Sequence, residues 1–511
     1  MVNASRTPSL ADEKGVAEYE ENVMDIAAGR GHLATDEYGQ ALVEFDKAAE
    51  SRLRLKIDLF IIPTVSLMYL FCFIDRANIG NAKLAGFEKD LGLEGLDYNI
   101  VLSVFFVSYI VFEIPSNLMC KWIGPGWWLP SIEIGFGICS VATAFVNNIH
   151  EACGVRFLLG NLFEAGLMPG IAYYLSRWYR RSELAFRLSL YIVMAPLAGA
   201  FGGLLASGIL KLDSFGSLSS WQMIFAIEGI VTICIGIISF FTLTDRPETA
   251  LWLSQEEKDL AVTRIKSERV ATTELLDKFD TAKMMRGIFS PTTITTAFIY
   301  MLNNITVQGL GMFAPTIIKT IYPNAGVISQ QLHTVPPYIV GAFFTLLFPF
   351  LSWRFDHRLI FFVLCAPLMI IAGYIMFLAS EDPMVRYGAT FLISSGSFAF
   401  GAFCAAHVSA NVVSDTARSS AIGAMVMFGN IGGLISTWSY LPFDGPNYHI
   451  GNGLNLATSS TTLLLGASLW VYMTWDNKRR DRVDVAAALA GLSQMQIQDL
   501  DWRHPGFRWR P

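Results

Sequence analysis

The chain alternates long apolar runs with shorter polar intervals, and the length of the runs gives the first expectation. A bilayer core of about 30 Å needs about 20 mostly apolar residues per helix. By that measure the sequence predicts twelve membrane-spanning helices, six before a charged interval and six after it. The first six lie near 57–78, 98–119, 127–147, 152–175, 187–210 and 221–243. The second six lie near 292–318, 332–353, 358–379, 386–408, 418–440 and 452–475.

The polar intervals divide the chain into five parts. We predict a polar N-terminal tail at 1–54, a six-helix bundle at 55–243, a linker at 244–290, a second six-helix bundle at 291–475 and a C-terminal tail at 476–511. The expected fold class is therefore an all-α integral membrane protein.

Lysine and arginine are concentrated in alternate intervals, which indicates the orientation. They precede the first span, fill the interval between the fourth and fifth spans and the linker, and follow the last span, whereas the loops after the third and eleventh spans (NNIHE and DGPNYHIGNG) have none. We expect a multi-pass protein with both termini and the linker in the cytoplasm. The plasma membrane is the expected location, although these residues do not distinguish it from an internal membrane.

Composition agrees with this class and excludes others. Hydrophobic residues make up 53% of the 511 residues and charged residues 16%, whereas soluble proteins carry about 25% charged residues. No basic block with interleaved aromatic residues indicates nucleic acid, and no nucleophile–base pair or metal-ligand spacing indicates an enzyme, a cofactor or a metal site. The seven cysteines are scattered along the chain, and we expect them to act as small apolar packing residues. We expect a monomer in a lipid bilayer.

Ionisable side chains at membrane depth are costly, so each one is a candidate for function. Glu164 lies near the middle of the fourth span, where partial desolvation disfavours its charged form and suits it to carry a proton; bracing of two helices is the alternative. Arg76 in the first span, with Asn78 nearby, and Arg156 in the fourth offer planar donors that match a carboxylate. Alternatively, Asp75 neutralises Arg76, and Arg156 lies at the level of the lipid headgroups.

The second half contributes polar candidates as well. Asn303, Asn304 and Gln308 cluster in the seventh span, where they either orient a polar ligand or join helices by hydrogen bonds. His407 and Asn411 lie at the inner part of the tenth span. We expect His407 to be a proton-coupling group and Asn411 a substrate contact, with a structural histidine as the alternative.

Five charged residues are candidates for gating: Asp75, Glu113, Arg354, Asp356 and Arg358. The last three follow the eighth span, where charges can brace the cytoplasmic side.

Several strings identify a family by resemblance. FIDRANIGNAKLAGFEKDLGL, EAGLMPGIAYYLSRWYRRSE, TVPPYIVGAF and MFGNIGGLIST resemble the fungal anion:cation symporters of the major facilitator superfamily, the allantoate permease type. The string MLNNITVQGLGMFAPTIIKTIYP is most similar to nicotinic acid permeases. The resemblance implies two pseudo-symmetric six-helix bundles, a central site with alternating access, and symport of protons with a small carboxylate. It also implies roles for Arg76, Arg156 and Glu164.

One departure from the family pattern concerns the fourth span. Asn161 is an extra residue between Arg156 and Glu164. Seven residues return an α-helix almost to the same face, whereas eight turn it by about a quarter more, at 3.6 residues per turn. Either a π-bulge absorbs Asn161, or Arg156 and Glu164 do not face one cavity.

Three functions compete. The preferred one is a proton symporter that imports a small carboxylate such as nicotinate. The second is a proton-driven exporter of hydrophobic compounds, which would favour an apolar, aromatic cavity without a cation. The third is a nutrient receptor that no longer transports and signals through its tails.

Overall fold

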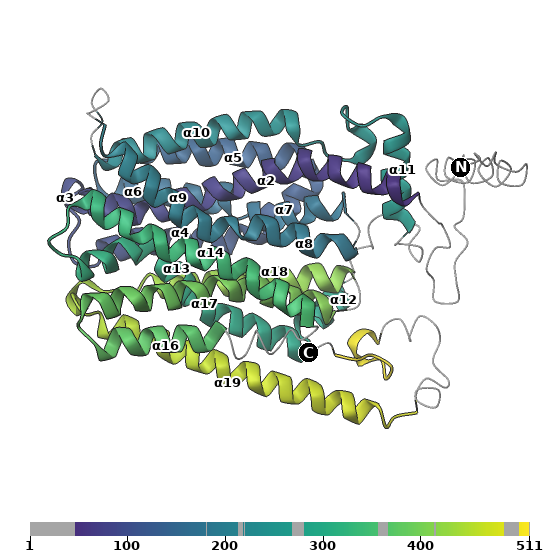
Figure 1. Ribbon diagram of the computed structural model, residues 1–511. Helices are drawn as coiled ribbons and strands as arrows, with labels where there is room; N and C mark the ends of the chain where they lie inside the picture. The colour runs from purple at the N-terminus through teal and green to yellow at the C-terminus, as the bar shows by residue number, and fades with distance from the viewer. Residues whose placement is uncertain are drawn as a thin grey trace, which may run out of the picture.

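The computed structural model describes residues 46–179, 181–212, 218, 220–267, 281–355, 366–412, 415–484 and 500–509. These residues form an all-helical fold, as the sequence predicted, with the long helices running side by side (Figure 1).

Each of the six spans expected in the first half coincides with a helix or with helices in series. The elements are α2 (Lys47–Leu84), the short α3 (Phe87–Asp90), α4 (Asp97–Ile123), α5 (Pro125–Thr143), α6 (Ile149–Leu158), the π-helix η1 (Leu159–Glu164), α7 (Leu167–Ser176), α8 (Arg181–Ile192), α9 (Met194–Ile209) and α10 (Trp221–Thr242). The fourth expected span is built from α6, η1 and α7, and the fifth from α8 and α9.

The linker region contributes α11 (Gln255–Ser267) and α12 (Thr281–Ile288), and the second half follows. Its helices are α13 (Pro291–Ile321), α14 (Val327–Phe355), α16 (Ala366–Ala379), α17 (Pro383–Ala410), α18 (Asp415–Ser436) and α19 (His449–Arg480). The first residues of the expected ninth span, 358–365, lie outside the described residues.

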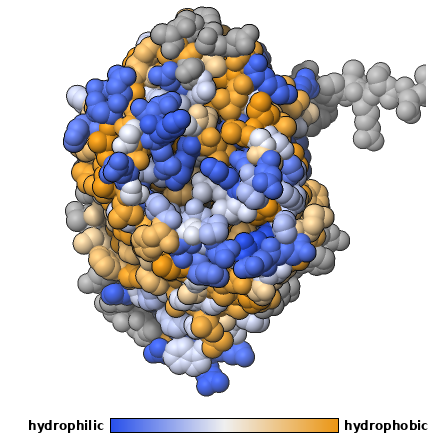
Figure 2. Space-filling view, turned by 90° about the vertical axis from the view of Figure 1, so that its left-hand side faces the viewer, coloured by the Kyte–Doolittle hydropathy of each residue, from blue (hydrophilic) through white to orange (hydrophobic). Residues whose placement is uncertain are grey.

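The two halves lie against each other, with α2–α10 in one layer and α13–α19 in the other (Figure 1). We call the end where α2 begins and α19 ends the terminal end, and the opposite end the distal end. Figure 2 shows the distal face, with hydrophilic residues gathered across it and hydrophobic residues along its flanks. Exposed apolar side chains such as Leu59, Phe241 and Val471 have the character expected of a surface in contact with lipid.

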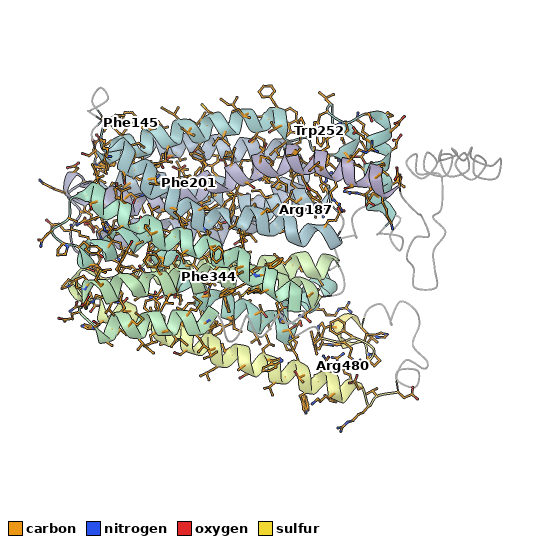
Figure 3. The ribbon with its side chains drawn as sticks, viewed as in Figure 1. Phe145, Arg187, Phe201, Trp252, Phe344 and Arg480 are labelled. Carbon is orange, nitrogen blue, oxygen red and sulfur yellow. The ribbon has the colours of Figure 1, made fainter. Side chains whose placement is uncertain are left out.

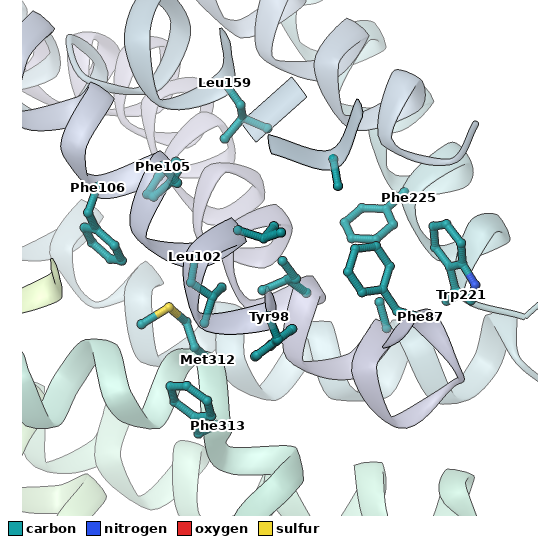
Figure 4. Packing of buried hydrophobic residues seen from close by; sticks show 14 of the residues in the cluster. Phe87, Tyr98, Leu102, Phe105, Phe106, Leu159, Trp221, Phe225, Met312 and Phe313 are labelled. Carbon is teal, nitrogen blue, oxygen red and sulfur yellow. The ribbon is translucent and has the colours of Figure 1, made fainter. Parts of the chain in front are cut away.

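The halves pack closely at the distal end. Tyr98 and Leu102 of α4 share one buried cluster with Met312 and Phe313 of α13 (Figure 4). A Cβ atom added at Gly80 of α2 would lie 2.5 Å from the carbonyl oxygen of Met312, so only glycine permits this approach. We call this contact region the distal seal.

Hydrogen bonds reinforce the distal seal. The Asn99 side chain donates to the carbonyl oxygen of Thr437 at 2.5 Å, and the Gln331 side chain donates to the carbonyl oxygen of Asn81 at 3.5 Å. Each bond joins one half to the other.

Ion pairs at the terminal end include two that join α2 to other elements of the first half and its linker. Lys56 of α2 pairs with Glu257 of α11 at 2.7 Å, and Arg187 of α8 pairs with Asp58 of α2 at 2.7 Å. Figure 3 shows Arg187 and Arg480 at this end, one in each half. The bonds of Asn99 and Gln331 that join the halves therefore lie at the opposite, distal end.

Candidate functional site

A cavity lies between the two halves at mid-depth. Its walls come from α2, α4, η1, α7, α8 and α9 on one side and from α13, α17 and α18 on the other, and it holds about 880 Å³ of empty space, counting open solvent at its mouth. Ala405 of α17 lines it, and it lies in the part of its helix nearer the terminal end. The cavity therefore extends from mid-depth toward the terminal end, away from the distal seal.

Arg76 and Glu164 form a buried ion pair in the wall of this cavity. Arg76 Nε donates to Glu164 Oε1 at 2.6 Å, and Arg76 Nη2 contacts the same oxygen. The two residues are 8% and 1% exposed. Glu164 Oε2 is buried and has no hydrogen-bond partner among the described residues. One oxygen of the carboxyl group therefore neutralises the guanidinium, and the other is unused.

Aromatic rings surround the guanidinium. The Arg76 Cζ atom lies 4.8 Å from the ring centroid of Phe73, 5.4 Å from that of Phe105 and 5.5 Å from that of Tyr109. The ring faces attract a cation and restrict its position. Arg76 is thus held in place independently of Glu164, and much of the wall beside it is flat and apolar.

Amide side chains of α13 form part of the opposite wall. Asn303, Asn304 and Gln308 all line the cavity. Asn303 donates to the carbonyl oxygen of Ser397 at 3.1 Å, and Asn304 donates to that of Tyr300 at 2.9 Å. The structure therefore brings these three residues to the same cavity as Arg76 and Glu164.

Arg156 lies outside the cavity, which differs from its expected role as a substrate contact. The π-helix η1 spans the position of Asn161, so the extra residue is absorbed by a π-bulge, the first of the two alternatives. Arg156 is nevertheless 3% exposed in α6 and lies 5.9 Å from the ring centroid of Phe225. Its Nε and Nη2 atoms have no hydrogen-bond partner in the described part of the chain. The reason is its depth: Arg156 lies about two turns closer to the distal end than Glu164.

Asp75 and Asn78 point away from the cavity, although they flank Arg76 in the sequence. Asp75 accepts hydrogen bonds from Ser140 of α5 at 3.0 Å and from Thr232 of α10 at 3.2 Å. Asn78 donates to Glu228 of α10. Successive residues of an α-helix are separated by about 100°, so Asp75 faces the support helices while Arg76 faces the cavity. Asp75 does not neutralise Arg76 in this arrangement.

Among the gating candidates, Glu113 links the two halves. Glu113 of α4 accepts a hydrogen bond from Asn430 of α18 at 3.2 Å, and Asn430 lines the cavity. Arg354 is in the last turn of α14. Asp356 and Arg358 lie outside the described residues.

His407 and Asn411 are neighbours at the end of α17 and do not line the cavity. Asn411 donates to the carbonyl oxygen of His407 at 2.9 Å, a bond between successive turns of the same helix. Their placement supports a structural role at the terminal end of α17 more directly than contact with a substrate.

Comparison with known proteins identifies the family. Residues 65–437 match the family model described as the Major Facilitator Superfamily. The chain belongs to the major facilitator superfamily. It is a membrane transporter rather than an enzyme.

Similar proteins agree with membership of this superfamily. An uncharacterized transporter of Schizosaccharomyces pombe is 32% identical over 510 residues, which cover 99% of this chain and 98% of that protein. The major facilitator-type transporter hxnP of Emericella nidulans is 28% identical over 92% of this chain and 95% of its own length. A bacterial homologue of the human lysosomal transporter Spinster has the same fold, with a TM-score of 0.61 at 16% identity over 83% of this chain and 97% of that one.

The sequence analysis missed one buried acid of this transporter. Glu133 of α5 is 1% exposed, and neither carboxyl oxygen has a hydrogen-bond partner among the described residues. It lies close enough to Asp75 and Glu164 to interact with both electrostatically. The signal was available, because an acid within an apolar span (SIEIGFG) meets the same criterion that singled out Glu164.

The first half therefore buries more carboxyl groups than guanidinium groups. Five acids (Asp75, Glu113, Glu133, Glu164 and Glu228) and two arginines (Arg76 and Arg156) are each at least 92% buried. An arginine stays charged, whereas an unpaired buried carboxylate is costly enough to take a proton instead. The described part of this half therefore holds more buried acids than arginines to neutralise them.

Proposed function

We propose that this transporter is a proton-coupled symporter that imports a small organic carboxylate by alternating access. Nicotinate or a related vitamin or nitrogen-source anion is the best candidate. The proposed setting is the plasma membrane, with both termini in the cytoplasm and the protein acting as a monomer.

The observation that carries the proposal is the Arg76–Glu164 pair in the cavity wall. An incoming carboxylate offers Arg76 the same chemistry as Glu164, so the two anions compete for one guanidinium. Once displaced, Glu164 is a buried carboxylate without a cation, which costs several kcal/mol unless it binds a proton. Binding of the anion and binding of a proton are therefore favoured together.

The opposite wall supports a ring-shaped carboxylate. Tyr300 of α13 and Phe398 of α17 line the cavity together with Asn304 and Gln308. Flat apolar faces suit an aromatic ring, and the amide groups can donate to a ring nitrogen. The polar residues of the string that resembles nicotinic acid permeases are the ones on this wall, which favours nicotinate within the carboxylate class.

The contacts between the halves support transport by alternating access. The distal seal is closed, and the cavity extends toward the terminal end. With the termini in the cytoplasm, this arrangement is the inward-facing state. The Glu113–Asn430 bond at mid-depth is one contact that must change when the halves rock to the other state.

A proton-driven exporter of hydrophobic compounds is the second candidate, and the aromatic cavity wall favours it. A neutral hydrophobic cargo gives Arg76 no partner to replace Glu164, however, so binding would not drive protonation. The alternatives differ in direction: an exporter lowers the cellular content of its cargo, whereas an importer raises the content of the carboxylate.

Uptake of labelled nicotinate by cells that express the protein, with and without a protonophore, tests the proposal. We expect accumulation that the protonophore abolishes. Arg76→Ala should abolish uptake, and Arg76→Lys should retain only a small part of it because an ammonium group lacks the planar fork. Accumulation that ignores the protonophore would refute symport, and normal uptake by Arg76→Ala would refute the site.

A further inference from the structure

Besides Glu164 Oε2, a second hydrogen-bond acceptor in the cavity wall has no partner among the described residues. Asn303 of α13 lines the cavity and is 4% exposed. Its Nδ2 atom donates to the carbonyl oxygen of Ser397 at 3.1 Å. Its Oδ1 atom is buried and accepts no hydrogen bond from any described group.

The orientation of this amide is fixed by its partner. The Ser397 carbonyl can only accept, so the NH₂ group of Asn303 must face α17 and the carbonyl oxygen must point elsewhere. A flipped amide would place two acceptors together and would leave the NH₂ group unpaired. Oδ1 is therefore the free end of the side chain.

Unlike this oxygen, the neighbouring polar side chains Asn304 and Thr306 of α13 have hydrogen-bond partners. Asn304 donates to Tyr300, and the Thr306 hydroxyl group donates to Asn455 Oδ1 at 2.7 Å. Most buried polar atoms in proteins find a partner, and an exception at a binding site calls for an explanation. The cargo of the cavity is the natural source of the missing donor.

The cavity thus has two different requirements for its cargo. Arg76 supplies donors on the α2 wall and matches a carboxylate, whereas Asn303 Oδ1 supplies an acceptor on the α13 wall and matches an O–H or N–H group. Sites that leave a polar group unpaired with the wrong ligand discriminate strongly against that ligand. An apolar wall alone would discriminate much less.

We propose that the preferred substrates are ring carboxylates that carry a hydrogen-bond donor, an O–H or N–H group, which Asn303 Oδ1 accepts. This inference rests on the proposed function, since it assumes that Arg76 holds the carboxylate. It adds a second point of recognition that nicotinate itself, whose ring nitrogen is an acceptor, does not satisfy.

Matched ligands test the inference with the purified full-length protein. Binding is measured for nicotinate, for nicotinates that carry a hydroxyl or an amino group, and for nicotinates that carry a methoxy or a methyl group at the same ring position. Each ring position is tested in turn. In the wild-type protein we expect the donor-bearing compound at the favoured position to bind at least about tenfold more tightly than its methoxy or methyl counterpart.

Asn303→Leu has a similar volume and removes the acceptor. It should reduce the preference to about onefold, because the donor-bearing and the methylated compounds then meet the same apolar group. Asn303→Thr retains a hydroxyl oxygen that can accept, and it should restore part of the preference. It also serves as the second variant if the leucine protein does not fold.

The outcomes separate this inference from the proposed function. Equal binding of donor-bearing and methylated compounds to the wild-type protein, or a preference that survives Asn303→Leu and Asn303→Thr unchanged, overturns the inference and leaves carboxylate symport intact. Binding of none of the ring carboxylates overturns both.

Discussion

Glu164→Gln isolates the coupling step, because it replaces the carboxyl group by a neutral amide of the same shape. In the wild-type protein the substrate must displace Glu164 from Arg76, and Glu164 must then take up a proton. One coupled proton changes the dissociation constant tenfold per pH unit, or 1.36 kcal/mol, in the range where Glu164 titrates. In the variant this proton is absent. The slope of log Kd against pH should therefore fall by one.

The same variant should bind the anion more tightly. Loss of one partner of a buried ion pair costs about 3–5 kcal/mol, because Arg76 is left without a counter-charge in the empty cavity. A substrate carboxylate restores that counter-charge. If half of the lower figure, about 1.5 kcal/mol, is recovered on binding, Kd at neutral pH falls about tenfold.

Equilibrium binding of labelled nicotinate across a pH series measures both effects. Glu151→Gln is the matched control, since Glu151 is an exposed carboxyl group in the first turn of α6, and it should retain the wild-type slope. An unchanged slope in Glu164→Gln would refute the competition between Glu164 and substrate for Arg76. Weaker binding at every pH would show that Glu164 contacts the substrate instead of competing with it.

Three further predictions concern the framework around the site. Gly80→Ala places a Cβ atom 2.5 Å from a backbone carbonyl oxygen of α13 and should open the distal seal. Spin labels on the two halves should then report longer distances at the distal end. Gly208→Ala, whose Cβ atom has no neighbour within 4 Å, should leave these distances unchanged. Trp509, 2% exposed, anchors the C-terminal segment, so Trp509→Ala should weaken its docking by about 3 kcal/mol and expose residues 500–509 to protease; protection equal to wild type would contradict this. Burial opposes ionisation of Glu257, but hydrogen bonds from Lys56 and from the backbone hold its pKa below the usual value. The contribution of Glu257 to the stability of the fold is therefore present above the ordinary carboxyl pKa and is lost as the pH falls through the lowered pKa. Hydrogen exchange of α11 should rise over that pH range in the wild type and not in Glu257→Gln.

The membrane-spanning helices were predictable because one physical requirement dominates them. A span must be long and apolar, and that property is local in the sequence. The positions at which a span is interrupted are not set by its length or apolar character. The π-helix at Leu159–Glu164 was foreseen as one alternative because an inserted residue must be absorbed somewhere. The break between α8 and α9 near Val193 lies one turn before Pro196, which has no N–H group to bond to the carbonyl oxygen four residues earlier.

The site residues could be predicted because each of them is polar or ionisable within an otherwise apolar membrane span. Arg76, Glu164 and the amides of α13 meet in one cavity for that reason. The sequence could not show which way each side chain faces. Asp75, adjacent to Arg76, turns to α5 and α10, and Arg156 is buried beneath the distal seal, because helix rotation and depth are set by packing between helices far apart in the chain. Glu133 was overlooked although its position in an apolar span was visible.

Proton movement that accompanies the carboxylate tests the central claim most directly. The protein is reconstituted into liposomes that contain a pH-sensitive dye, nicotinate is added outside, and internal pH is followed alongside labelled uptake, with protein-free liposomes correcting for passive entry of the neutral acid. The account predicts internal acidification in step with uptake, and the loss of both in Arg76→Ala. Protein-dependent entry of nicotinate without internal acidification would contradict it.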